Sequence, residues 1–202
     1  MLPTTPRCKL QLPIIITIAL LLSSLSLIGV RATAQTSGQS PTDAVLKLID
    51  RQSYNDAIAR LEEILERDPR NAEALTYMAT ANLYQRRDFS KALEEFKQAF
   101  KAGGGATFFV AHSHEKVTTA DVVDYCRGWL HLRKDGVEFV PTEGTHGFKC
   151  RYSDVEEFER NKLSKKVFHI KCGGKTQNFR GRSNTDLEPL LIVALYKSFT
   201  QN

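Results

Sequence analysis

Apolar residues recur at two different spacings along this chain, which indicates two kinds of structure. Between residues 41 and 102 they recur every three or four positions, as on one face of an amphipathic helix. Proline at position 69 and the three glycines at 103–105 interrupt this pattern, because neither residue type continues a helix well. The pattern predicts four helices, with these bounds: from Pro41 to a turn near Ser53, from Asn55 to Arg67, from the cap residue Asn71 to Arg86, and from Ser90 to Lys101.

After the glycines the spacing changes to an alternation of apolar and polar residues, which is typical of strands. The Asp135-Gly136 pair marks a hairpin turn between two of these strands. A leucine-rich amphipathic helix, Asn184 to Phe199, ends the pattern, and a short helical turn or loop is expected at Thr118–Asp121. The expected strands are Phe108–His112, Cys126–Arg133, Val137–Val140, Gly147–Tyr152, Lys166–Cys172 and Thr176–Arg180.

These elements predict an α+β fold, in which N-terminal antiparallel helix-pair repeats precede a small antiparallel β-barrel or sandwich closed by a C-terminal helix. We expect a signal peptide or membrane anchor at 1–34, a linker at 35–40, two helix pairs at 41–103 and a β domain at 104–202.

The N-terminal segment has the layout of a secretory signal. Arg7 and Lys9 precede the apolar run 14–30, and a small-x-small ending follows it at 32–34. Cleavage is the favoured interpretation, but the run is long enough to stay as an anchor, and it would then tether the protein to a membrane. The protein is therefore expected in the periplasm or cell envelope of a bacterium. Without residues 1–34 the formal charge falls from +5 to +2, since three basic residues are lost, and no basic stripe is left for a nucleic acid.

The two helix pairs repeat each other in sequence. Ala57, Leu61 and Ile64 recur 35 positions later as Ala92, Phe96 and Ala99. With Pro69 after the first copy, residues 41–102 resemble two tetratricopeptide repeats, although glycine replaces the second proline. The resemblance implies a concave face that holds a peptide or protein helix. Candidate residues for that face are Lys47, Arg51, Asn82 and Arg86.

Two repeats are fewer than the roughly three that such arrays usually need for stability. We therefore expect the C-terminal part to pack on the fourth helix, or the protein to form a homo-oligomer.

The order of strands and the final helix resemble a pleckstrin-homology-like barrel over residues 104–202. Lipid-binding members of that group carry Lys and Arg in the loop after the first strand. Here that loop, 117–125, has Asp121 and Asp124 and no base, so the resemblance does not imply phosphoinositide binding.

Three cysteines lie in the C-terminal part, Cys126, Cys150 and Cys172. In an oxidising compartment they allow one disulfide and one remaining thiol, and the spacing does not choose the pair; three buried thiols are the default. On the strand that holds Cys126, the alternation turns Trp129 outward beside Arg127 and Arg133. These three residues are a candidate interface, which the fourth repeat helix or the loop 141–146 could instead cover.

Two histidines offer a sharper hypothesis. His112 and His114 share one face of a strand, a spacing that can hold a metal ion, and His131, His146 and His169 lie in the same part of the chain. The five histidines are scattered in sequence, and surface or hydrogen-bonded histidines are the preferred interpretation.

No acid, base and nucleophile converge in the sequence. The preferred function is therefore a non-catalytic envelope adaptor or scaffold that binds a protein or peptide and needs no cofactor. The alternative is a metal-binding protein or metal-dependent enzyme that uses the strand histidines.

Overall fold

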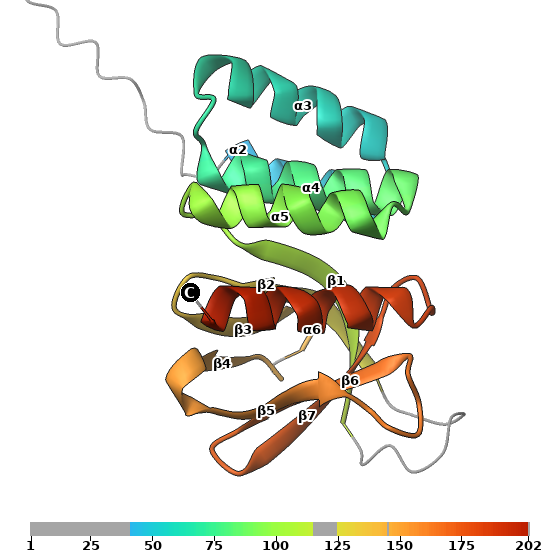
Figure 1. Cartoon of the computed structure of the whole chain (residues 1–202). Helices are drawn as coiled ribbons and strands as arrows, with labels where there is room; N and C mark the ends of the chain where they lie inside the picture. The colour runs from blue at the N-terminus through green and yellow to red at the C-terminus, as the bar shows by residue number, and fades with distance from the viewer. Residues whose placement is uncertain (1–40, 115–124, 145, 202) are drawn as a thin grey trace, which may run out of the picture. The chain divides into compact units, whose positions relative to one another are not determined.

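The computed structural model describes residues 41–114, 125–144 and 146–201, which all belong to one compact unit, Gln39–Asn202 (Figure 1). The proposed signal or anchor, the linker and the turn expected at Thr118–Asp121 lie outside the described residues. Within the described ranges, no helix is both long and apolar enough to cross a membrane.

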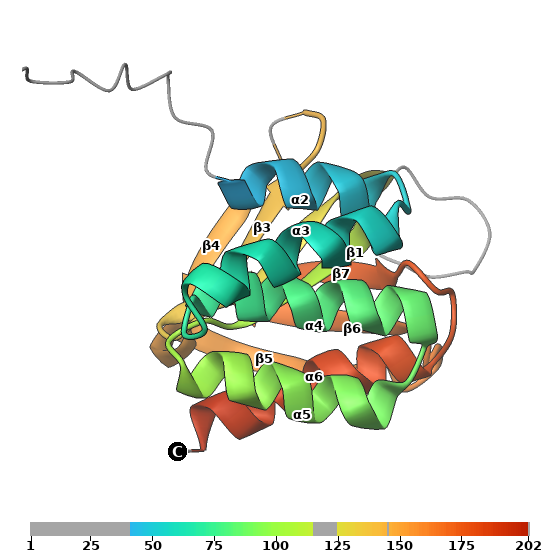
Figure 2. The same cartoon turned by 90° about the horizontal axis from the view of Figure 1, so that it is seen from above.

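Four helices come first, as the spacing predicts: α2 (Pro41–Asp50), α3 (Tyr54–Arg67), α4 (Ala72–Arg86) and α5 (Phe89–Lys101). Local chemistry sets their ends. The side chain of Asn71 accepts a hydrogen bond from the Ala74 N–H, and Asp88 does the same for the Lys91 N–H, so both act as N-caps. Helix α4 ends because Arg87 adopts the left-handed conformation, with φ 55°. Seen from above, these helices lie side by side (Figure 2).

Seven antiparallel strands form one sheet in the order β4-β3-β2-β1-β7-β6-β5. A final helix, α6 (Leu187–Thr200), packs against β5, β6, β7 and α5. The strands are β1 (Ala106–Ser113), β2 (Tyr125–Leu132), β3 (Gly136–Pro141), β4 (Phe148–Arg151), β5 (Val155–Arg160), β6 (Val167–Cys172) and β7 (Lys175–Gly181).

The sheet is bent but not closed. Its end strands β4 and β5 are not paired with each other, so the expected barrel is not confirmed, whereas the α+β class is. The bend brings distant strands together inside: the ring of Phe179 on β7 lies 5.4 Å from Phe139 on β3 and 5.9 Å from Phe148 on β4. A disulfide between Cys150 on β4 and Cys172 on β6 joins the two halves covalently.

The helices cover the outer face of β1 and β2, as Figure 1 shows. Phe109 of β1 and Trp129 of β2 pack edge to face, 5.0 Å apart, in a cluster with apolar residues of α2, α3 and α4. Polar contacts fix the docking, because the Thr80 hydroxyl donates to the Thr107 carbonyl and the Tyr84 hydroxyl accepts from the Phe109 N–H.

The prediction that the C-terminal part packs on the fourth helix is confirmed. On α5, the ring of Phe96 lies 5.1 Å from Phe108 of β1, and Phe100 stacks on Phe199 of α6 at 3.9 Å. The open end of the helix array is therefore buried within the same chain.

Candidate functional site

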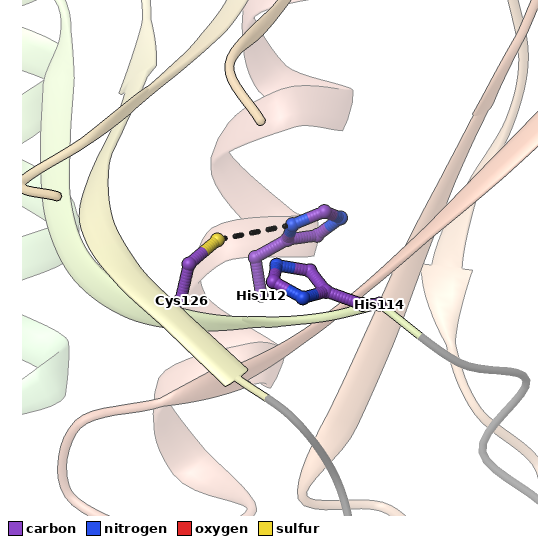
Figure 3. Close-up of side chains that lie close together, drawn as sticks. All are labelled: His112, His114 and Cys126. Atoms are coloured by element: carbon purple, nitrogen blue, oxygen red, sulfur yellow. Dashed lines mark hydrogen bonds between the residues drawn. The ribbon is translucent and has the colours of Figure 1, made fainter. Parts of the chain in front are cut away.

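The C-terminal end of β1 brings two imidazoles and a thiol together (Figure 3). His112 lies inside the bent sheet between the rings of Phe139 and Phe179, and His114 follows the strand two residues later. Cys126 is the cross-strand partner of His112 on β2. The antiparallel register therefore places the thiol next to the first imidazole, although 14 positions separate them in sequence.

Each of these three residues has one ligand atom within 4.8 Å of a ligand atom of the other two. The Cys126 Sγ lies 3.4 Å from the His112 Nδ1. The ring of His114 lies 5.4 Å from that of His112 and 4.3 Å from that of His146, which stands two residues before β4. Three of the five histidines thus lie near one another, with His114 adjacent to both of the others.

Gln177 of β7 orients the His112 ring. Its Oε1 lies 2.7 Å from the His112 Nε2, and a carbonyl oxygen can only accept, so Nε2 carries the proton and donates it. The lone pair of Nδ1 is then turned toward Cys126. Metal-binding histidines commonly have such a partner, which sets the tautomer and holds the ring in place.

Burial lowers the pKa of His112, whose side chain is 5% exposed. The hydrogen bond to Gln177 raises this pKa, whereas the imidazoles of His114 and His146 lower it further. The neutral ring is the form that can bind a metal ion.

A cleft of about 970 Å³ opens beside these residues, between the end of β1, the start of β4 and the turn from β6 to β7. Its lining consists of His112, Ser113, His114, His146, Gly147, Phe148, Gly174, Lys175, Thr176, Gln177 and Asn178. We call it the histidine cleft. It gives solvent and small ions a route to the imidazoles.

The other two histidines lie elsewhere. His131 is buried, and its Nδ1 lies 3.0 Å from the Thr107 hydroxyl. His169 lies on β6 beside two exposed carboxylates, with Nε2 3.3 Å from Glu157 and 3.8 Å from Glu159. The Lys171 Nζ also lies 3.8 Å from Glu157, so one of these carboxylates already pairs with an ammonium group.

Of the residues expected to bind a peptide, three are exposed and one contacts the next helix. Lys47, Arg51 and Arg86 are exposed, whereas Asn82 donates its amide hydrogens to Glu95 on the next helix. The inner face of α2 and α4 is filled by Phe109 and Trp129 of the chain's own sheet, so that face is not open to a ligand. A peptide could meet only the outer surface of the helices.

The interface expected around Trp129 needs correction. The alternation correctly predicted that Trp129 lies on the opposite face of β2 from Leu130. However, α2, α3 and α4 cover that face, and Trp129 is only 7% exposed. Arg127 and Arg133 are exposed, and Arg133 pairs with Glu138 at 3.5 Å.

Sequence reasoning proposed His112 and His114 but missed three neighbours. Cys126 was expected to be a small buried apolar residue, and no functional role was predicted for His146 or Gln177. The alternation did turn Cys126 inward, and His112 also belongs to the inward face. Pairing these two strands in register would have placed the thiol beside the imidazole.

No protein-family model matches this sequence, and a search of curated proteins finds no relative. Solved structures that are similar to part of the chain include two that match slightly less than half of it. One is the C-terminal domain of an unknown protein from Leishmania infantum, with 13% identity and a TM-score of 0.34, over 45% of this chain and 80% of that one. The other is the N-terminal PH domain of human ARAP2, with 9% identity and a TM-score of 0.34, over 46% and 80%. Nothing about ligand or function follows from similarity at this level.

Proposed function

We propose that this protein binds a borderline transition-metal cation, with Zn²⁺ the best match, through His112, His114 and Cys126. The observation that carries the proposal is the mutual approach of three ligand atoms within 4.8 Å. Imidazole nitrogen and thiolate sulfur are the ligands that Zn²⁺ and Cu²⁺ prefer, whereas Mg²⁺ and Ca²⁺ prefer oxygen.

The spacing fits a tetrahedral ion. Zn–N and Zn–S bonds of about 2.05 and 2.3 Å at a tetrahedral angle put the nitrogen and sulfur about 3.6 Å apart. The His112 Nδ1 and the Cys126 Sγ are 3.4 Å apart. Little movement of this pair is therefore needed, and the exposed ring of His146 next to His114 is the nearest candidate for a fourth ligand.

Cobalt substitution tests the proposal directly, because a thiolate bound to Co²⁺ gives a charge-transfer absorption in the near ultraviolet. We expect this band in the parent protein, with one metal ion per chain by mass spectrometry. Cys126→Ser should remove the band, and His114→Gln, at an exposed position, should weaken binding without unfolding the chain.

His169→Gln is the matched control, since this histidine lies outside the cluster and should leave the spectrum unchanged. Cys150 and Cys172 share a disulfide and cannot supply the sulfur. A Co²⁺ spectrum that is the same in Cys126→Ser as in the parent, or no binding of Co²⁺ and Zn²⁺ at all, would rule the site out.

The same geometry supports a second function. A thiol beside an imidazole whose other nitrogen meets an amide oxygen is also the arrangement of cysteine hydrolases, with Cys126 as nucleophile, His112 as base and Gln177 as orienting group. Iodoacetamide distinguishes the two. A metal site predicts slow alkylation of Cys126 that speeds up on adding a chelator, whereas a hydrolase predicts fast alkylation that a chelator does not change.

The adaptor function remains a proposal for the outer helical surface, supported by the exposed side chains of Lys47, Arg51 and Arg86. Assignment of the helices to the tetratricopeptide class rests on the 35-residue repeat, and assignment of the sheet to the pleckstrin-homology-like class rests on the order of its elements. Crosslinking in native cell envelopes tests the adaptor role. If a partner protein is recovered, substituting these three side chains together should abolish its recovery.

A further inference from the structure

A second cleft, of about 660 Å³, lies on the outer face of the sheet, where the helices stop covering it. Three arginines from two strands and the segment after β7 meet there, and none of the described residues that line the cleft is acidic. We call it the arginine cleft; its lining consists of Gln52, Phe109, Val110, Ala111, Tyr125, Arg127, Arg180, Gly181, Arg182 and Asn184.

The strand register creates this arrangement. Ala111 of β1 pairs with Arg127 on β2 and with Arg180 on β7, so both arginines project from the same face on either side of a small side chain. Since neighbouring strands lie about 4.8 Å apart, the two Cα atoms are separated by about 10 Å. Two long guanidinium side chains at that distance can close on a single group between them.

The guanidinium of Arg180 lacks a partner for one of its hydrogens. Its Nε is buried and makes no hydrogen bond to any described residue, while its Cζ lies 5.6 Å from the ring centre of Tyr125. Leaving a buried charged donor unsatisfied costs free energy, which an acceptor supplied from outside would recover.

Arg182 is held rigidly at the edge of the same cleft. It donates hydrogen bonds to the carbonyls of Ile49 and Asp50 at the end of α2, and its Cζ lies 4.9 Å above the ring of Phe109. Its position is therefore set by the docked helices, and its charge adds to that of the other two arginines.

We propose that the arginine cleft binds a tetrahedral oxyanion group, a phosphate or sulfate, between Arg127 and Arg180. Planar guanidinium groups pair with such oxygens through two parallel N–H···O bonds, and none of the described residues that line the cleft carries a negative charge that would compete for them. The buried Arg180 Nε would donate to one of the oxygens. This inference is independent of the metal site, since the two clefts share no lining residue.

Nuclear magnetic resonance of the arginine Nε–H groups tests the inference on the whole chain, with inorganic phosphate as the probe. Arg180→Lys identifies the Arg180 signal by its disappearance. We expect phosphate to shift that signal along a saturating curve. Arg127→Gln, at an exposed position, should weaken the affinity about tenfold or more, because it removes a charged donor pair.

Arg67→Gln is the matched control: it removes the same charge from an exposed site at the end of α3 and should leave the affinity unchanged. Vesicles of phosphatidylcholine and phosphatidic acid in equal amounts separate the two sources of phosphate. Binding to free phosphate supports a soluble ligand, and binding to the vesicles alone, lost in Arg127→Gln, supports a lipid headgroup. No shift with either probe, or a shift reduced equally in Arg127→Gln and Arg67→Gln, would overturn the proposal.

Discussion

Cys150 on β4 and Cys172 on β6 form a disulfide between strands that four others separate in the sheet order, namely β3, β2, β1 and β7. Hydrogen bonds do not close this sheet, because its end strands are unpaired. The disulfide is thus the covalent connection across the open side. Among the described cysteines, Cys126 is the one outside this disulfide.

We expect loss of this disulfide to destabilise the protein. In the chain-entropy model, a crosslink between residues 22 positions apart lowers the entropy of the unfolded chain and so raises its free energy by about 3 kcal/mol. Cys150→Ala/Cys172→Ala should lower the free energy of urea unfolding by about that amount. Dithiothreitol should lower the Tm of the parent but not of the double variant; equal effects on both would show that another interaction is responsible.

Gln177 should tune metal affinity without contacting the metal. Gln177→Leu removes the acceptor that holds the His112 Nε2–H, so we expect Zn²⁺ to bind about 10- to 100-fold more weakly in a chelator competition assay. Gln177→Glu keeps an acceptor and should restore affinity. If the leucine variant binds Zn²⁺ as the parent does, His112 is not a ligand held by Gln177.

Tyr84 links the helices to the sheet through one hydroxyl. It accepts from the Phe109 N–H at 2.8 Å and donates to the buried carboxylate of Glu188 at 2.9 Å. Tyr84→Phe leaves both groups without this partner and should cost about 1–3 kcal/mol of unfolding free energy. Tyr54→Phe removes a hydroxyl from the ring that stacks on Tyr84 and serves as the control, with an expected change within about 0.5 kcal/mol.

His131 should make stability depend on pH. Burial, with a smaller effect of Arg133, lowers its pKa from 6.5 to about 4. The unfolded chain therefore binds a proton more readily, and stability falls as the pH drops from about 6.5 toward 4, by about 3 kcal/mol from this group. Urea unfolding between pH 7 and pH 4 with chelator present measures the slope. In His131→Gln the loss of unfolding free energy between pH 7 and pH 4 should be smaller by about 3 kcal/mol. An unchanged loss would contradict the lowered pKa of His131.

Local sequence signals predicted the described helices but not every strand. The caps Asn71 and Asp88, the stop at Pro69 and the glycines at 103–105 act within one turn of the chain, so the bounds of α3, α4 and α5 follow from neighbouring residues to within one position. By contrast, α6 begins three residues after the expected Asn184, and β5 was not expected. Alternation also assigned Cys126 and Trp129 to opposite faces of β2 correctly.

Tertiary structure alone decided what each face meets. Sequence alternation left open whether the outward face of Trp129 is an interface or is covered by a helix or loop. Docking of α2, α3 and α4 buries it, because their apolar faces pack against Phe109 and Trp129. Likewise, His112, Cys126 and His146 converge only through the register of β1 with β2 and the bend of the sheet, and the Cys150–Cys172 pairing depends on the same bend. Periodicity reports the direction in which a side chain points, whereas contacts between distant segments depend on how elements pack in three dimensions.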